Sequence, residues 1–173
     1  MPGVRGPAGV APLTGSLMVR RRYRSCAARP TSIRRVPLRV GIDLVQVSTV
    51  RDAIAAHGDH YLERVYTARE LEDCRTGGVV DPQRLAARFA AKEAAMKALR
   101  VADEAVPLPT IEVVRGRTGY AELELHGPAG ELARAQGITS LAVSLTHEDE
   151  YASAVVAAEL APAPAQAEGG DHR

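Results

Sequence analysis

Two charged side chains one turn apart on a predicted helix are the first candidates for chemistry in this chain of 173 residues. The stretch 84–100, RLAARFAAKEAAMKALR, consists almost entirely of good helix formers and predicts the strongest helix of the chain. Glu93 and Lys97 are spaced i,i+4 within it and therefore lie on one side of that helix. The pair can be an ordinary surface ion pair. Its alternative use is a carboxylate ligand for Mg2+ together with an ammonium group that neutralises phosphate charge.

A second carboxylate, Asp43, lies in a segment with the pattern of a strand. Apolar residues alternate along 36–44, which predicts a strand that buries one face, and Asp43 then lies on the opposite face together with Gly41 and Val45. An aspartate in this position can simply be exposed to solvent. It can also complete a Mg2+ site with Glu93, because Mg2+ in proteins binds one or two carboxylates plus the phosphates of a substrate.

Three further polar residues are candidates for binding a ligand. Lys92 falls in the middle of the large apolar side chains of the predicted helix, where a lysine must reach solvent, pair with an acid or face a ligand. Arg88 lies at the edge of the same apolar stripe. His147 follows a short alternating apolar segment, and it is of interest only if the fold brings it beside Asp43 and Glu93.

The elements that must position these residues mix helices and strands without a regular βαβ rhythm, which predicts an α+β fold. Thr67 is a plausible N-cap for one of the short helices. Serine nucleophile elbows of the G-x-S-x-G type and Walker-type phosphate loops are absent from the sequence. The predicted short helices are 50–56, 68–74 and 127–136, the predicted strands are 111–114, 120–125 and 141–145, and 151–160 is a strand or a helix by its pattern alone.

Composition divides the chain into a basic extension (1–35), a periodic domain (36–160) and a loose tail (161–173), and both ends are expected to be disordered. Residues 1–42 contain nine arginines and no acid, whereas the rest of the chain contains 13 basic and 21 acidic residues. The arginines can form a solvated extension, contact nucleic acid or belong to an organellar transit peptide, and they can also result from a misassigned translation start. The sequence leaves these alternatives open.

Cysteine content and hydropathy predict a soluble, cytoplasmic protein. Cys26 and Cys74 lie far apart without metal-ligand spacing, so two reduced thiols are expected. The chain contains no apolar run close to the roughly 20 residues that a membrane helix requires.

Several segments, in this order and at this spacing, resemble the holo-[acyl-carrier-protein] synthases, which are small single-domain 4′-phosphopantetheinyl transferases. The resemblance covers about 36–160. Any one of the motifs is weak, but the ordered set is specific. The segments are VGIDLV at 40–45, RVYTAREL at 64–71, RFAAKEA at 88–94 followed by KAL at 97–99, and VSLTH at 143–147.

The resemblance implies a fold and a reaction. The fold would be a small antiparallel sheet packed with one long and several short helices. The donor would be coenzyme A, the acceptor a serine of an acyl or peptidyl carrier protein, and the released product adenosine 3′,5′-bisphosphate. Which carrier is served, that of a fatty-acid, polyketide or peptide synthase, stays open. The resemblance also implies a homotrimer with active sites between subunits, with no membrane or nucleic-acid partner expected.

The resemblance also implies roles for the candidate residues. Asp43 and Glu93 would bind Mg2+ and would meet either within one chain or across an interface. Glu93 would take the serine proton, and Lys97 would neutralise phosphate charge. Arg88, Lys92 and His147 would bind the phosphates of coenzyme A.

The sequence also departs from the family pattern. Gln46 and Thr49 occupy places where Glu and Arg are usual, and Arg100 stands where the helix usually ends in Gly. Gly119-Tyr120-Ala121 replaces the usual Gly-Lys-Pro turn. These changes affect the expected choice of carrier and the affinity for coenzyme A. They leave open a non-catalytic relative that binds coenzyme A or a carrier. A third hypothesis, a small nucleic-acid-binding protein that uses the basic arm, is disfavoured by the acidic balance of 43–173.

Overall fold

The computed structural model describes residues 37–101 and 106–162; the predicted basic extension and almost all of the predicted tail lie outside the described residues. In chain order the elements are β1 (Leu38–Gln46), α1 (Val47–His57), α2 (Asp59–Val65), α3 (Ala68–Asp73), β2 (Arg75–Thr76), β3 (Val79–Val80), α4 (Pro82–Ala98), a 3-10 turn η1 (Leu108–Thr110), β4 (Ile111–Arg115), β5 (Ala121–Leu125), α5 (Gly127–Ala135), β6 (Ile138–His147) and β7 (Tyr151–Leu160). None of the helices in these ranges is long and apolar enough to cross a membrane.

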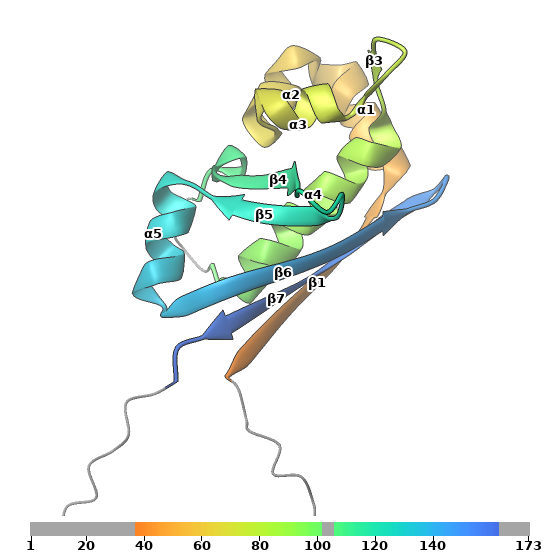
Figure 1. The fold of residues 1–173 in the computed structure, drawn as a ribbon. Helices are drawn as coiled ribbons and strands as arrows, with labels where there is room; N and C mark the ends of the chain where they lie inside the picture. The colour runs from red at the N-terminus through yellow and green to blue at the C-terminus, as the bar shows by residue number, and fades with distance from the viewer. Residues whose placement is uncertain (1–36, 102–105, 163–173) are drawn as a thin grey trace, which may run out of the picture. The chain divides into compact units, whose positions relative to one another are not determined.

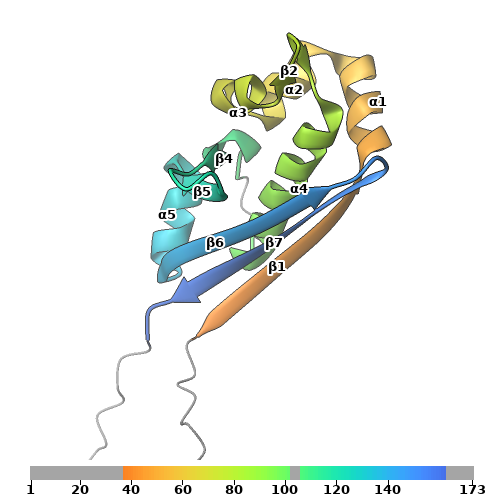
Figure 2. The same cartoon turned by 45° about the vertical axis from the view of Figure 1, so that its right-hand side comes forward.

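The largest sheet has three antiparallel strands in the order β1-β7-β6, and the long helix α4 packs along one of its faces (Figures 1 and 2). The predicted α+β fold with a small antiparallel sheet and one long helix is therefore confirmed. The pattern of 151–160, which fits either element, forms the central strand β7.

Small residues let α4 approach the sheet closely. Ala90, Ala94 and Ala98 of α4 are fully buried, as is Ala158 of β7. At Gly41 of β1 a Cβ atom would lie 1.9 Å from the carbonyl oxygen of Ala94. Only glycine fits at this crossing, which brings the backbone of β1 against that of α4.

The alternation predicted for β1 is present, but the prediction of its buried face is wrong. The large apolar side chains of β1 are 57–64% exposed, whereas Gly41 and Val45 on the other face are buried beneath α4. Alternation defines two faces without saying which one the helix covers, and the alanine-rich helix packs best on the face with the smaller residues. The exposed side chains are Leu38, Val40, Ile42 and Leu44.

Three short helices and a small hairpin gather around the N-terminal end of α4 (Figure 2). The predicted cap of α3 is confirmed, because Thr67 and Glu70 form a capping box. The sequence does not predict α2 or the β2–β3 hairpin. The strands β4 and β5 pair as an antiparallel hairpin and α5 follows them, close to the predicted bounds.

The long helix begins at Pro82, with Asp81 as its N-cap, two residues before the predicted start. At its other end Arg100 has φ 51°, the left-handed conformation that glycine usually adopts after a helix. Arg100 therefore adopts a glycine-like conformation at the position where the resemblance leads us to expect glycine.

Candidate active site

Asp43, Glu93 and Lys97 come together between β1 and α4 within one chain. The Lys97 ammonium lies 2.8 Å from Oδ1 of Asp43, and it also donates a hydrogen bond to the carbonyl oxygen of Ile42 at 2.8 Å. Burial and the negative charge of Asp43 raise the pKa of Glu93, while the positive charge of Lys97 opposes this shift. Within one chain, Lys97 therefore contacts Asp43, and the two carboxylates lie close enough for the charge of one to affect the pKa of the other.

The backbone around Asp43 is held from both sides. Ser153 of β7 donates a hydrogen bond from its hydroxyl to the carbonyl oxygen of Asp43 at 2.8 Å. The contact of Gly41 with Ala94 fixes the distance between β1 and α4 just before the aspartate. The Asp43 side chain is only 18% exposed.

The chemistry of this donor set fits Mg2+. Two carboxylates beside one ammonium group leave a net negative charge at a partly buried position, which a divalent cation can compensate. Mg2+ binds through one or two carboxylates plus ligand phosphates, and Asp43 and Glu93 supply two.

A second set of metal-ligating types lies elsewhere, on the β4–β5 hairpin. Ligand atoms of Glu112, Glu124 and His126 lie within 4.8 Å of one another. Glu112 already binds the Thr67 hydroxyl at 2.6 Å and His126 at 3.1 Å, and Arg69 lies 3.8 Å from Glu124. These contacts account for the group without a metal ion.

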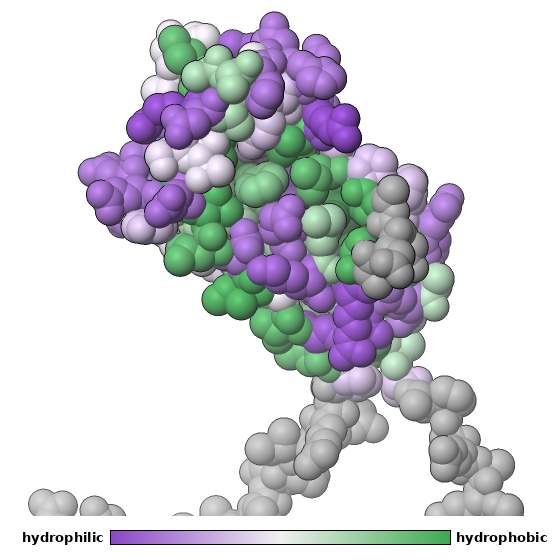
Figure 3. Space-filling view, turned by 180° about the vertical axis from the view of Figure 1, so that it is seen from behind, coloured by the Kyte–Doolittle hydropathy of each residue, from purple (hydrophilic) through white to green (hydrophobic). Residues whose placement is uncertain are grey.

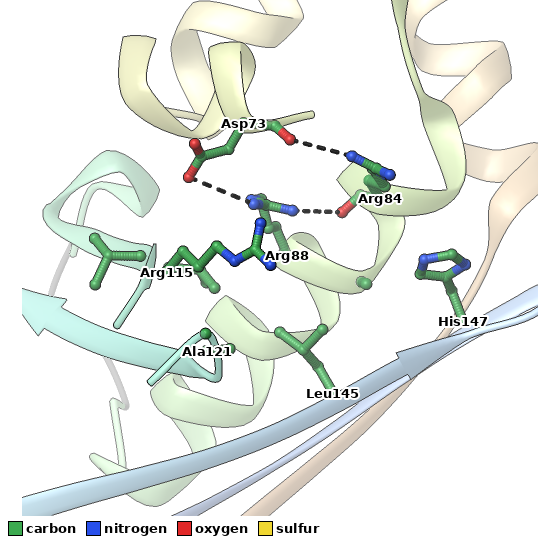
Figure 4. Close-up of a pocket in the computed structure, with 11 residues that line it drawn as sticks. Asp73, Arg84, Arg88, Arg115, Ala121, Leu145 and His147 are labelled. Carbon is green, nitrogen blue, oxygen red and sulfur yellow. Dashed lines mark hydrogen bonds and ion pairs between the residues drawn. The ribbon is translucent and has the colours of Figure 1, made fainter. Parts of the chain in front are cut away.

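A cationic pocket of about 350 Å³ lies beside α4 (Figure 4), and Glu93 is not among the residues that line it. Arg88 and Glu93 are five residues apart, which places them about 140° apart around the helix. The charged and titratable residues that line the pocket are Asp73, Arg84, Arg88, Arg115 and His147.

The pocket has more positive than negative charge. Asp73 lies 3.8 Å from the guanidinium of Arg88, and its carbonyl oxygen accepts a 3.5 Å hydrogen bond from Arg84. Arg84 also pairs with Asp81 at 3.5 Å, but two carboxylates cannot neutralise three guanidinium groups. Nε of Arg88 is buried without a partner in the described part of the chain. A buried donor without a partner is costly, so the pocket suits an anion with several oxygens, such as a phosphate.

The structure thus divides the predicted residues into two groups. Arg88 and His147 line the pocket, whereas Asp43, Glu93 and Lys97 do not. Because β7 lies between β1 and β6, Asp43 and His147 are at least two strand spacings apart, about 10 Å. His147 is therefore not beside Asp43 and Glu93 within a single chain.

Lys92 belongs to neither group, and its expected contact with coenzyme A is not supported. Its side chain is fully buried, with its ammonium group 2.8 Å from Glu70 and donating to the carbonyl oxygens of Leu108 and Ile111. Burial lowers the pKa of Lys92, and the charge of Glu70 opposes this effect. Of the three uses that the sequence allows for this lysine, the structure shows pairing with an acid.

Sequence reasoning did not identify Arg84, Arg115 or Asp73. Arg84 has a signal that could have been used, because it precedes Arg88 by one helical turn and so shares its side of α4. Arg115 has no such signal in the sequence, because its position depends on how the β4–β5 hairpin packs against the rest of the domain.

A metal-compatible acidic pair and a cationic pocket, on one α+β domain, are features expected of a class of proteins that bind phosphorylated ligands. The family model of the 4′-phosphopantetheinyl transferase superfamily matches residues 39–156. The holo-[acyl-carrier-protein] synthase of Chloroflexus aurantiacus is 47% identical over 130 residues, covering 68% of this chain and 95% of the relative. That of Halorhodospira halophila is 42% identical over 118 residues, covering 68% and 93%.

Solved structures agree with these relatives. The Chronobacterium ammoniagenes ACPS-CoA complex has a TM-score of 0.64 and 29% identity, and covers 73% of this chain and 99% of that one. The Helicobacter pylori holo-[acyl-carrier-protein] synthase in complex with coenzyme A has a TM-score of 0.60 and 26% identity, covering 69% and 98%. The chain therefore belongs to the 4′-phosphopantetheinyl transferase superfamily, an enzyme family, in the group of the holo-[acyl-carrier-protein] synthases, and the resemblance seen in the sequence is confirmed.

Proposed function

We propose that this protein transfers 4′-phosphopantetheine from coenzyme A to a serine of an apo acyl or peptidyl carrier protein and releases adenosine 3′,5′-bisphosphate. The observation that carries the proposal is the convergence of Asp43, Glu93 and Lys97 on one partly buried site in a member of this superfamily. Transfer of a phosphate-linked group requires mainly positioning and neutralisation of charge, and this site supplies both.

Each residue of the site has a distinct task. Asp43 and Glu93 would hold Mg2+, which would neutralise charge on the diphosphate of coenzyme A. Lys97 holds Asp43 in place and adds a positive charge next to the transferred phosphoryl group. Glu93 accepts the proton of the carrier serine, because a carboxylate positioned at the reacting group can act as a general base.

The cationic pocket would bind the nucleotide end of coenzyme A. Arg88 and His147 keep the role expected from the sequence. Arg84 and Arg115, which line the same pocket, would be further donors to phosphate oxygens. Guanidinium groups suit this task because they bind phosphate through two parallel hydrogen bonds.

The exposed apolar face of the sheet supports the proposal of a homotrimer. Large apolar side chains of β1 lie next to the half-exposed Val155 of β7, and Figure 3 shows hydrophobic side chains along the lower edge of the domain, where the sheet lies. Contiguous apolar surface of this kind usually marks a contact with another chain.

The separation of the two groups of site residues supports the same assembly. An active site that needs the Asp43 group of one subunit and the Arg88 pocket of another requires a contact between two different surfaces. Such head-to-tail contacts close into rings, and three subunits is the number that the family resemblance suggests.

A transfer assay over a panel of carriers tests the function. Purified protein, coenzyme A and Mg2+ are incubated with apo carriers of fatty-acid, polyketide and peptide synthases, and adenosine 3′,5′-bisphosphate is measured by chromatography. We expect release with at least one apo carrier and none after chelation of the metal. Binding of coenzyme A without release on any carrier would instead support the non-catalytic relative.

A further inference from the structure

One buried carboxylate, that of Glu70, contacts three elements of the fold. It is fully buried on α3, and it accepts hydrogen bonds from the backbone N–H of Thr67 at 2.9 Å and of Val113 at 3.0 Å. Its Oε2 also lies 2.8 Å from the ammonium group of Lys92. Thr67 begins α3, Val113 lies in β4 and Lys92 lies in α4, so a single side chain joins all three elements.

The same three elements supply most of the walls of the cationic pocket. Asp73 comes from the end of α3, Arg84 and Arg88 come from α4, and Val113 and Arg115 come from β4. Glu70 precedes Asp73 by one helical turn, and Asp73 in turn lies 3.8 Å from Arg88. In each of these elements, Glu70 therefore contacts a pocket-lining residue or lies within a few residues of one.

Lys92 completes this arrangement as the counter-ion. Its ammonium group has three N–H donors, and Glu70 and the carbonyl oxygens of Leu108 and Ile111 supply three acceptors. A fully buried ion pair with all its hydrogen bonds made holds one geometry, because any displacement leaves a charge without a partner at low dielectric.

We propose that Glu70, held by Lys92, is the positioning residue of the nucleotide pocket and fixes the placement of Arg88 and Arg115 for binding coenzyme A. The choice of coenzyme A as the ligand rests on the proposed function, whereas the contacts of Glu70 do not depend on it. Asp43 lies on β1 and Lys97 on another side of α4, and neither contacts Glu70. Loss of the pair therefore acts on the binding of coenzyme A more than on the transfer step.

The test compares Glu70→Gln with two control variants, one at a buried position and one at an exposed position. Leu62→Ala removes a buried side chain of α2 that does not line the pocket, and Glu72→Gln alters an exposed carboxylate on α3 itself. The Kd of coenzyme A and of adenosine 3′,5′-bisphosphate is measured by calorimetry well below the melting temperature of each variant. KM and kcat are measured in the transfer assay.

We expect Glu70→Gln to raise the Kd and KM for coenzyme A by about tenfold or more, the size expected from loss of a charge-assisted hydrogen bond, with a smaller change in kcat. Leu62→Ala and Glu72→Gln should leave the Kd within about twofold of wild type, a change of roughly 0.4 kcal/mol. If Glu70→Gln does not fold, the neutral pair Glu70→Gln with Lys92→Met is measured with the same expectations.

The outcomes separate the two proposals. An unchanged Kd in a destabilised Glu70 variant, or an equal rise in the Leu62→Ala control, overturns the positioning role. A wild-type protein that binds neither nucleotide overturns the proposed function instead.

Discussion

The ammonium group of Lys97 lies 2.8 Å from the carboxylate of Asp43, across the line where α4 packs on β1. This contact joins two residues 54 positions apart in the chain and brings the charges of the proposed active site together. It also places a cation next to Glu93, one helical turn away. The proposed chemistry depends on this arrangement, so each of its parts can be tested separately.

Replacing Lys97 by methionine should lower kcat by about 100-fold or more, because the site loses the ammonium group that neutralises phosphate charge and orients Asp43. Steady-state kinetics of carrier modification measures the effect. Arg64→Met removes an exposed cation of α2 and serves as the control. A Lys97→Met variant with the wild-type kcat would contradict the role of this residue.

Gly41→Ala should destabilise the protein by about 1–3 kcal/mol, the usual cost of overpacking. The added Cβ would lie 1.9 Å from the carbonyl oxygen of Ala94, so β1 must move away from α4. This movement also separates Asp43 from Lys97, and transfer should fall together with stability. Chemical denaturation gives the free energy of unfolding, and a variant as stable and active as wild type would argue against the close packing.

Glu93→Gln should abolish transfer while making the folded protein more stable at neutral pH. Since its pKa is raised in the folded state, Glu93 binds more protons there than in the unfolded chain, over the pH range between its ordinary and its raised pKa. The free energy of unfolding of the wild-type protein therefore falls as pH rises through that range. The glutamine variant has no titrating group at this position and does not lose this stability. Thermal unfolding of both proteins without Mg2+, from about pH 4 to about pH 8, measures the difference. A variant that is less stable than wild type at the upper end of this range would contradict the expected sign.

Ile42→Asp should dissociate the proposed homotrimer. Ile42 is 60% exposed in the single chain and lies at the centre of the apolar face of β1, where a buried unpaired charge is costly. Light scattering coupled to size-exclusion chromatography gives the mass in solution. Val79→Asp at the β2–β3 hairpin changes a similarly exposed apolar residue (72%) outside that face and should leave the mass unchanged. A monomeric wild-type protein would contradict the proposed assembly.

Local sequence patterns predict much of the site formed by Asp43, Glu93 and Lys97, because these patterns reflect the short-range geometry of helices and strands. The i,i+4 spacing places Glu93 and Lys97 together, and alternation in β1 separates Asp43 from its apolar neighbours. Which face of β1 the helix covers depends on the close approach at Gly41, a tertiary contact. The prediction of the buried face was wrong for that reason.

Long-range packing also determines the parts of the site that the sequence does not reveal. Lys92 on an apolar stripe is compatible with three environments, and only the position of Glu70 selects one of them. Arg115 reaches the pocket because the β4–β5 hairpin packs beside α4 and β6. Neither position follows from periodicity or spacing along the chain.

Intact-mass spectrometry of an apo carrier protein tests the central claim most directly. With coenzyme A and Mg2+, the wild-type protein should increase the carrier mass by one phosphopantetheine, and so should Glu131→Gln, a matched change at an exposed position on α5. Glu93→Gln should leave the carrier mass unchanged while still binding coenzyme A. Transfer by Glu93→Gln at the wild-type rate, or no transfer by wild type to any carrier, would contradict the account.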